Sequence, residues 1–341
     1  MARFDTTPPS RDQRFSCPWW LRGSHLQSLW GPTFRSRALV QYVRERLDTP
    51  DGDELWLDHL PGGSPTTPHL LVLHGLEGSS YSPYVQGLMT LAFERGWRAT
   101  AFNCRSCARD PGDTITWIPN RTSRLYHSGE TGDFDFVVRT LQQREPKARM
   151  VAAGISMGGN VLLKWLGENP TQHSIVAAVS MSAPYDLGAG ADHLERFVGR
   201  YYTRHFLQTL RAKLRHHAAT FPQFAARIDL PRALRAQSFR EFDEAATAPL
   251  NGFADADDFY ERCSSIAFVE RIATPTLCIS AADDPLIPPS VMEQARHRFS
   301  ASIEPLFTRH GGHVGFVGGP HPWSPRYWAE ERMLEWLEHR L

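Results

Sequence analysis

The chain has 341 residues, 41% hydrophobic and 22% charged, as expected of one large globular domain with or without an inserted lobe. Its 37 basic and 37 acidic residues cancel, so the charge balance does not favour a nucleic-acid partner. No stretch approaches the ~20 consecutive apolar residues of a membrane span, and the N-terminus lacks the apolar segment of a secretory signal. The five cysteines are scattered and odd in number, which predicts a cytoplasmic protein with reduced thiols.

The first part of the chain predicts an arm, a hairpin and a buried strand. Residues 1–35 are rich in Pro, Arg and Trp, and we expect an ordered arm that packs its aromatic side chains on the body. Residues 38–47 and 53–60 alternate loosely and are separated by a Pro-Asp-Gly turn, which predicts two strands joined in a hairpin. The apolar run 69–74 predicts a parallel strand that is covered on both faces.

Helices and strands then alternate along the chain. An irregular stretch ends near residue 125, and the alternation of helices and strands continues after it. Such alternation is typical of an α/β fold with a mostly parallel central sheet flanked by helices. The predicted helices are 83–95 and 133–141, and the predicted strands are 97–102, 151–153, 175–181, 276–280 and 303–308.

The alternation of strands and helices stops between residues 186 and 268, where apolar residues recur at helical spacing without a strand-like run. We predict a helical lid there, inserted after the sixth core strand, between core segments 1–185 and 269–341. Its aromatic residues, such as Tyr201, Tyr202 and Phe206, either line a cavity or pack the helices together, and packing is favoured. The basic residues of the lid are expected on a solvated face: Arg211, Lys213, Arg215, His216 and His217.

A serine lies at the junction of a predicted strand and an apolar helix, within the sequence Gly-Ile-Ser-Met-Gly at residues 154–158. In that context the pattern G-x-S-x-G is typical of a nucleophile elbow, a sharp turn that presents the serine hydroxyl. Side chains in place of the two glycines would collide with the neighbouring strand and helix. We therefore predict that Ser156 is a nucleophile.

A serine nucleophile needs a base and a carboxylate that orients the base. In α/β-hydrolases the acid follows the serine in the chain and lies at a strand end. The strand 276–280 runs into Asp283 and Asp284. We favour Asp284 because it opens the pattern D-x-x-I-P, and Asp283 remains the alternative.

The base is expected after the next strand, 303–308, where the chain carries His310 and His313. His313 is favoured because it precedes an apolar turn, whereas His310 lies too close to the strand end to reach the serine easily. An oxyanion hole needs two backbone donors near the carbonyl oxygen. We predict the N–H groups of Leu76 and Met157, with Gly75 allowing close approach of the backbone.

The chain carries the strings HGLEGS at 74–79, SPY at 82–84, LYHSGET at 125–131, GISMGGN at 154–160, GHVGF at 312–316 and, in the arm, HLQSLW at 25–30. These strings resemble those of the YheT-like α/β-hydrolases. The resemblance implies a Ser156–Asp284–His313 triad and a carboxylic ester hydrolase without metal or cofactor, in a family whose animal members act on acylglycerols and phospholipids. One departure is Ser106, where relatives have glycine, and this puts the shape of that loop in doubt.

Two other polar pairs invite a functional interpretation. Cys104 and Cys107 form a CxxC, but no second pair at zinc-ligand spacing is evident and the chain is not thioredoxin-like, so we expect structural thiols. His127 and Glu130 precede a predicted helix, and we favour helix capping by residues 128–131 over a role in chemistry.

These observations predict a serine hydrolase of the carboxylesterase or acylglycerol lipase type, acting on small-molecule or lipid esters with short- to medium-chain acyl groups. An acyltransferase would use the same triad, with an alcohol or thiol in place of water. A non-catalytic, ligand-binding α/β-hydrolase is a further alternative. The sequence gives no indication of the oligomeric state.

Overall fold

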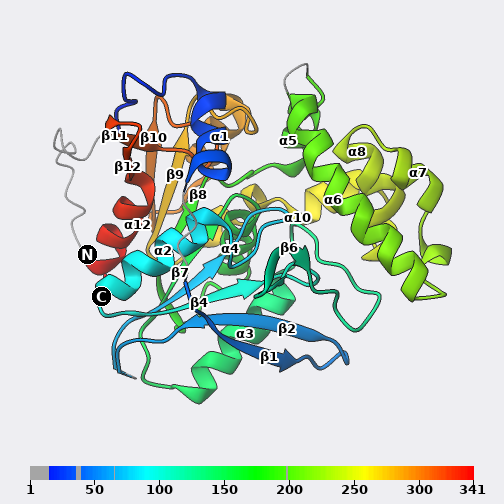
Figure 1. Cartoon of the computed structure of the whole chain (residues 1–341), viewed down its shortest axis with the longest axis horizontal. Helices are drawn as coiled ribbons and strands as arrows, with labels where there is room; N and C mark the ends of the chain where they lie inside the picture. Colours follow the sequence, from blue (N-terminus) through cyan, green and yellow to red (C-terminus); the bar gives the residue numbers. More distant parts are fainter. Residues whose placement is uncertain (1–14, 36–39, 65, 197–198) are drawn as a thin grey trace.

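The computed structural model describes residues 15–35, 40–64, 66–196 and 199–341 (Figure 1). Its centre is an eight-stranded sheet with the order β1-β2-β4-β3-β7-β8-β9-β10. β1 and β2 are antiparallel to their neighbours, and all pairs from β4 to β10 are parallel, as predicted. The strands are β1 Val43–Asp48, β2 Glu54–Leu60, β3 His69–Leu73, β4 Arg98–Asn103, β7 Met150–Ile155, β8 Ile175–Met181, β9 Thr276–Ala281 and β10 Ile303–Thr308.

Helices cover both faces of the sheet because the central strands are apolar on both. In β3, Leu71 and Leu73 pack into one core cluster, and Leu70 and Val72 pack into the other. The first cluster contains residues of α3 Thr131–Arg144, α4 Met157–Glu168 and α11 Pro289–Arg298. The second contains residues of α2 Pro83–Glu94 and α12 Trp328–Glu338.

The N-terminal arm contains α1 Ser24–Phe34 and contacts the body as expected, but its aromatic residues Trp19 and Phe34 remain exposed. The indole N–H groups of Trp19 and Trp20 donate to the carbonyls of Pro320 and Gly319, about 300 residues away. Residues 1–14, which belong to the predicted arm, lie outside the described residues.

Two short hairpins depart from the prediction. β5 Arg109–Asp110 and β6 Asp113–Trp117 pair within the stretch that was expected to be irregular. β11 Val317–His321 and β12 Ser324–Tyr327 pair before the last helix. The segments are too short to show alternation. The strand expected at 38–47 begins only at Val43, and its residues 38–39 lie outside the described residues.

Between β8 and β9 the described chain is helical and extends to one side of the sheet (Figure 1). We call residues 186–268 the lid. It has an apolar cluster of its own, which includes Leu207, Leu214 and Phe242. Its elements are α5 Leu187–Leu194, α6 Gly199–Thr220, η2 Ala225–Arg227, α7 Leu230–Arg235, α8 Phe239–Phe242, η3 Asp243–Thr247, α9 Ala248–Leu250, α10 Ala256–Cys263, η4 Ser265–Ala267 and, reaching past its end, η5 Val269–Arg271.

The prediction that the basic residues of α6 lie on a solvated face is wrong for two of them. Arg215 is exposed, but Lys213 and His217 are only 1% and 0% exposed. Because they are four residues apart, both point to the same side of the helix. Their partners come from core loops: Lys213 pairs with Glu77, and the Nε2 atom of His217 lies 3.3 Å from the hydroxyl of Ser106. Helical periodicity alone does not reveal such distant partners.

Candidate active site

Ser156 occupies a strained turn between β7 and α4. Its φ of 54° lies in the left-handed region, which residues other than glycine seldom adopt. A Cβ atom on Gly154 would lie 2.5 Å from the carbonyl oxygen of Gly158, and one on Gly158 would lie 2.5 Å from that of His74. Glycine is therefore required on both sides of the turn. The strain is held by the packed strand and helix, and it presents the hydroxyl at the sheet end.

Two hydrogen bonds join Ser156 to a histidine and an aspartate. The Nε2 atom of His313 lies 2.9 Å from the Oγ of Ser156, and its Nδ1 atom lies 2.9 Å from the Oδ2 of Asp284. Asp284 is 4% exposed and its Oδ1 accepts a hydrogen bond from the N–H of Leu286. Because an ionised carboxylate only accepts, Nδ1 carries a proton and Nε2 is free to take one from the serine.

The two alternative residues form a separate pair beside this arrangement. The Nδ1 atom of His310 lies 3.2 Å from the Oδ2 of Asp283, and the side chain of His310 is 50% exposed. Oδ1 of Asp283 accepts a hydrogen bond from the N–H of Gly312 at 3.0 Å. The pair thus stabilises the loop that carries His313.

The N-terminal arm holds the His313 loop from the other side. The hydroxyl of Ser28 accepts a hydrogen bond from the N–H of His313 at 2.8 Å. The buried amide of Gln27 both donates to the carbonyl of Val317 and accepts from its N–H. Residue-by-residue reasoning missed these positioning contacts. The only signal was the resemblance of the HLQSLW string.

The loop after β3 approaches the serine closely. A Cβ atom on Gly75 would lie 3.1 Å from the Cβ of Ser156, and the N–H of Gly75 donates to the hydroxyl of Tyr84. Leu76 and Met157 line the same cavity as Ser156. The two residues predicted to supply oxyanion donors therefore lie at the same cavity as the serine, and the role of their N–H groups stays a prediction.

The neutral imidazole of His74 holds the start of this loop through two hydrogen bonds. It is fully buried, which lowers its pKa to about 4. Its Nδ1 donates to the carbonyl of Gly75 at 2.7 Å, and its Nε2 accepts from the N–H of Cys104 at 3.1 Å. Protonation of Nε2 would replace this acceptor with a second donor.

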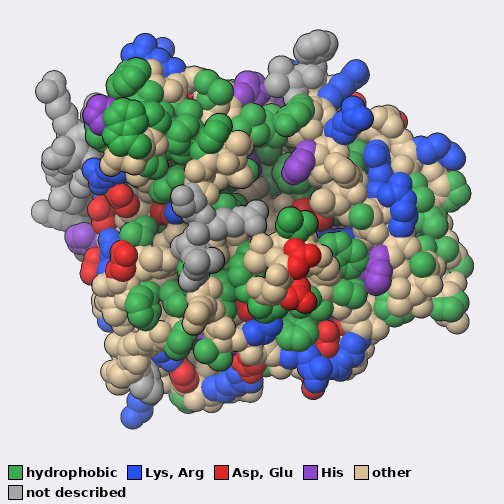
Figure 2. All heavy atoms as spheres, in the orientation of Figure 1, with side chains coloured by type: hydrophobic (Ala, Val, Ile, Leu, Met, Phe, Trp, Pro, Cys, Tyr) green, Lys and Arg blue, Asp and Glu red, His purple; other side chains and the backbone are tan. Residues whose placement is uncertain are grey.

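Two cavities meet at Ser156 and His313. The smaller, of about 110 Å³, is mostly apolar and is formed by the lid and the turn after Asp284. The larger, of about 500 Å³, lies between α1 and α6, where the face drawn in Figure 2 is hollowed. Apolar residues of the smaller cavity include Leu187, Ala191, Leu194, Phe206, Phe239, Phe259, Leu286 and Ile287.

The lid contributes aromatic side chains directly to these cavities. Tyr201 and Tyr202 line the larger cavity, and Phe206 lines both. The favoured interpretation, that these aromatics only pack helices together, is therefore wrong for these three. They lie on the side of α6 that faces α1 and the loop after β3. Neither element is near them in sequence.

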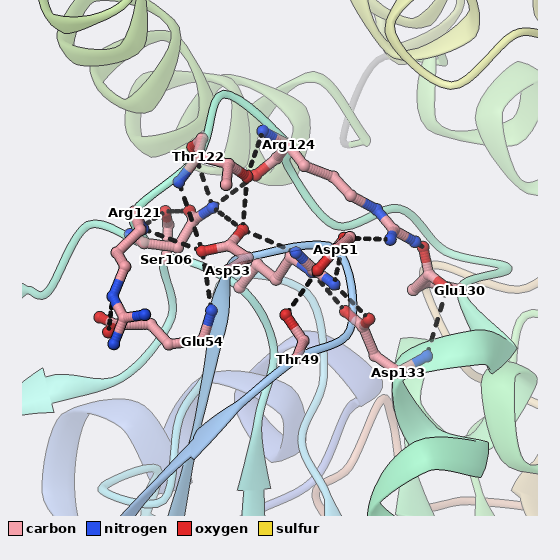
Figure 3. Close-up of polar contacts among 12 residues, drawn as sticks. Thr49, Asp51, Asp53, Glu54, Ser106, Arg121, Thr122, Arg124, Glu130 and Asp133 are labelled. Atoms are coloured by element: carbon pink, nitrogen blue, oxygen red, sulfur yellow. Dashed lines mark hydrogen bonds and ion pairs between the residues drawn. The ribbon is translucent and has the colours of Figure 1, made fainter.

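The loop that carries Cys104 and Cys107 is anchored by a buried polar network (Figure 3). The guanidinium of Arg105 binds Asp53 and Asp133 at 2.6 and 2.7 Å. Ser106 adopts a φ of 57°, so the serine found in place of glycine leaves the turn left-handed, and its hydroxyl donates to Asn120. Thr122 and the N–H of Arg121 also bind Asp53.

Both cysteines of the CxxC are free thiols. Burial raises the pKa of each, so they are protonated and poorly reactive at neutral pH. Among the residues that the structure describes, no three His, Cys, Asp or Glu side chains gather so as to hold a metal ion. Nothing in this geometry gives the thiols a role beyond structure.

Helix capping accounts for Glu130. It is the N-cap of α3, and its carboxylate accepts from the N–H groups of Gly132 and Asp133. It also pairs with Arg124. His127 lies beside it, and burial lowers the pKa of this histidine to about 4. Neither residue borders Ser156 in the two cavities that meet there.

Comparisons with known proteins agree with this geometry. Residues 68–320 match the family model described as the alpha/beta hydrolase fold. The chain is 38% identical over 315 residues to YheT of Escherichia coli (strain K12), spanning 92% of this chain and 89% of that protein. The chain belongs to the YheT-like α/β-hydrolases. This confirms the predicted family and fold.

Named activities are known for another relative and for a structural neighbour of this YheT-like hydrolase. The chain is 31% identical over 314 residues to phospholipase ABHD3 of Mus musculus, and the match spans 89% of this chain and 73% of that protein. The solved esterase Pf2001 of Pyrococcus furiosus superposes with a TM-score of 0.55 at 16% identity, spanning 88% and 93% of the chains, so the two share a fold. The predicted class of enzyme, a carboxylic ester hydrolase, agrees with these findings. Within the described ranges no helix has the length and apolar character needed to cross a membrane.

Proposed function

We propose that the chain is a serine hydrolase that cleaves carboxylic esters through Ser156, His313 and Asp284. The observation that carries the proposal is the hydrogen-bonded chain Asp284–His313–Ser156 at the junction of two cavities. The related phospholipase ABHD3 and the esterase fold of the structural neighbour support the same chemistry. Proteins of this fold use the same order of nucleophile, acid and base.

In the proposed mechanism, His313 takes the proton of Ser156 as the hydroxyl attacks the acyl carbonyl. The carbonyl oxygen gains negative charge and accepts hydrogen bonds from the N–H groups of Leu76 and Met157. His313 then protonates the leaving alcohol. Water, deprotonated by the same histidine, attacks the acyl-enzyme and releases the acid, while Asp284 keeps Nδ1 protonated and stabilises the imidazolium.

The two cavities suggest how an ester is divided between them. The smaller cavity has a mostly apolar lining, which suits a short- to medium-chain acyl group. The larger one is also bordered by polar side chains, among them Ser28, Arg109 and Thr209, and has room for a polar alcohol such as that of a small ester or an acylglycerol. We assign the acyl group to the first cavity and the alcohol to the second.

The experiment is hydrolysis of a p-nitrophenyl ester series from acetate to palmitate by the wild type, Ser156→Ala and Ser324→Ala. Ser324 is an exposed serine of β12 and serves as the control. We expect Ser156→Ala to lower kcat by roughly 10⁴- to 10⁶-fold and Ser324→Ala to leave it unchanged. Maximal rates are expected with short to medium acyl chains.

The same proteins are then treated with a fluorophosphonate, which labels an activated serine without needing turnover. Labelling is expected on Ser156 in the wild type and in Ser324→Ala. A wild-type chain that neither hydrolyses any ester in the series nor reacts with the fluorophosphonate would overturn the proposed function.

A further inference from the structure

A lysine of the lid reaches into the core beside the predicted oxyanion hole. Lys213 of α6 is 1% exposed, and its Nζ lies 2.7 Å from the Oε1 of Glu77 and 3.2 Å from the Sγ of Cys107. An ammonium group is rarely buried unless it is paired, because the unpaired charge costs several kcal/mol to desolvate. Since the Cys107 thiol is protonated, the negative partner of Lys213 is Glu77.

Glu77 follows Leu76 directly and is held from three sides. Its N–H donates to the hydroxyl of Tyr126 at 3.0 Å, and that hydroxyl donates in turn to the Glu77 Oε1 at 2.6 Å. Arg109 donates to the carbonyl of Glu77 at 3.1 Å. These contacts hold Glu77 at a φ of 56°, a left-handed conformation that turns the chain immediately after the Leu76 N–H.

The charge of Glu77 matters because of where it lies. Burial by itself would raise the pKa of Glu77, but the charge of Lys213 together with the hydrogen bonds from Lys213 and Tyr126 lowers the pKa, so the group is a carboxylate at neutral pH. Without Lys213, a buried negative charge would lie one residue from a donor meant to stabilise an oxyanion. Such a charge would repel the developing oxyanion and favour rearrangement of the loop.

We propose that Lys213 is a positioning residue: by neutralising Glu77 it holds the Leu76 N–H in place, so that docking of the lid helix α6 completes the oxyanion hole. The proposal rests on the proposed function and adds the means by which the lid acts on chemistry as well as on substrate shape. Lys213 touches neither the substrate cavities nor the triad in this arrangement. Its charged partner Glu77 lines the larger cavity, and we route the effect of Lys213 through that carboxylate.

The test compares Lys213→Met, Glu77→Gln and the double variant with the wild type, using kcat and KM for p-nitrophenyl butyrate and the thermal midpoint of unfolding. Arg215→Met is the matched control, because Arg215 is an exposed cation on the same helix. We expect Lys213→Met to lower kcat roughly 10- to 100-fold with little change in KM, since the lost interaction acts only on the transition state. Adding Glu77→Gln should restore kcat by about 5-fold or more, because it removes the unpaired charge but keeps the acceptor for Tyr126.

Three results would overturn the proposal: a kcat for Lys213→Met equal to that of Arg215→Met, a loss confined to KM, or no recovery in the double variant. If Lys213→Met does not fold, Glu77→Gln is compared with the double variant. In Glu77→Gln the carboxylate is replaced by a neutral amide, so further loss of Lys213 should lower kcat by less than about 3-fold. A further loss of kcat of about 10-fold in the double variant would contradict the proposal.

Fluorophosphonate labelling separates failure of this proposal from failure of the proposed function. The rate of labelling uses the same oxyanion donors but needs no turnover. Unchanged labelling in Lys213→Met, with normal labelling in the wild type, overturns only the role of Lys213. A wild type that is neither labelled nor active overturns both.

Discussion

The sheet end and the lid both form the candidate site, but they contribute to it differently. Ser156, Asp284 and His313 each follow directly on a core strand or lie in the loop after one, and local turns hold them. The lid supplies cavity walls and the buried ammonium of Lys213 from helix faces. Ser156, Asp284 and His313 are thus positioned mainly by the loops that follow core strands, whereas the room for substrate is set mainly by packing between segments distant in sequence.

The two regions also differ in how their polar groups are satisfied. At the sheet end, His74 and Asp284 bind groups within or next to the core loops. In the lid, Lys213 depends on a carboxylate 136 residues away, and Asp243, whose pKa burial raises to about 6, binds Thr247 and Tyr260. Variants in the two regions should therefore differ in the size of their effect on kcat and in whether they change selectivity for chain length.

The largest effect is expected at the sheet end, where neighbouring aspartates have different partners. Asp284→Asn should lower kcat by about 10⁴-fold, because an amide no longer fixes the proton on Nδ1 of His313. Asp283→Asn is the matched control, since among the described residues Asp283 binds His310 and the loop backbone rather than His313. Its kcat should stay within about 5-fold of the wild type. Equal losses in the two variants would contradict the assignment, and a greater loss in Asp283→Asn would reverse it.

The contrast between the regions explains what could be predicted from the sequence. The elbow, the strand ends and the chain order of Ser156, Asp284 and His313 leave local patterns, so the sequence was sufficient to propose them. The fold followed from the alternation of strands and helices, and was confirmed. Between Asp283 and Asp284 the pattern D-x-x-I-P favoured the residue that the structure places against His313.

What the sequence did not reveal depends on distant contacts. Lys213 was expected in solvent because helical periodicity reports the side of a helix that is apolar, and a buried cation looks like a surface residue. The carboxylate of Glu77, in the loop after β3, makes its burial favourable. Gln27 and Ser28 hold the His313 loop from nearly 300 residues away, and no spacing rule connects the two. Short hairpins such as β11–β12 carry too few residues to show a period.

The second prediction concerns stability: we expect protonation of His74 to lower the free energy of unfolding at acid pH. Its pKa of about 4 in the folded chain lies below the ordinary value of 6.5, so the unfolded chain binds the proton more tightly between those pH values. Stability from this group is therefore present above pH about 6.5 and is lost as the pH falls toward about 4. At pH 5 the loss should be about 2 kcal/mol relative to pH 8.

Urea unfolding at pH 5 and pH 8 measures this loss. His74→Gln should reduce the difference between the two pH values by about 2 kcal/mol, because glutamine does not titrate. His216→Gln, which replaces an exposed histidine of α6, should leave the difference unchanged. If the two variants behave alike, acid sensitivity does not arise at the loop after β3, and the remaining buried histidines, such as His69 and His127, become responsible.

The smallest effect is expected in the lid, and it should change selectivity rather than chemistry. Phe206 borders both cavities beside Ser156, so Phe206→Ala enlarges the space for the acyl group. We expect kcat/KM for p-nitrophenyl butyrate to fall roughly 10-fold and the preferred chain length to increase, as lost apolar contact is worth about 1–3 kcal/mol. Phe93→Ala, which alters an exposed phenylalanine of α2, is the control. A uniform loss at every chain length in Phe206→Ala would mean that the lid acts on the catalytic groups at this position too, and the division of roles between the two regions would fail there.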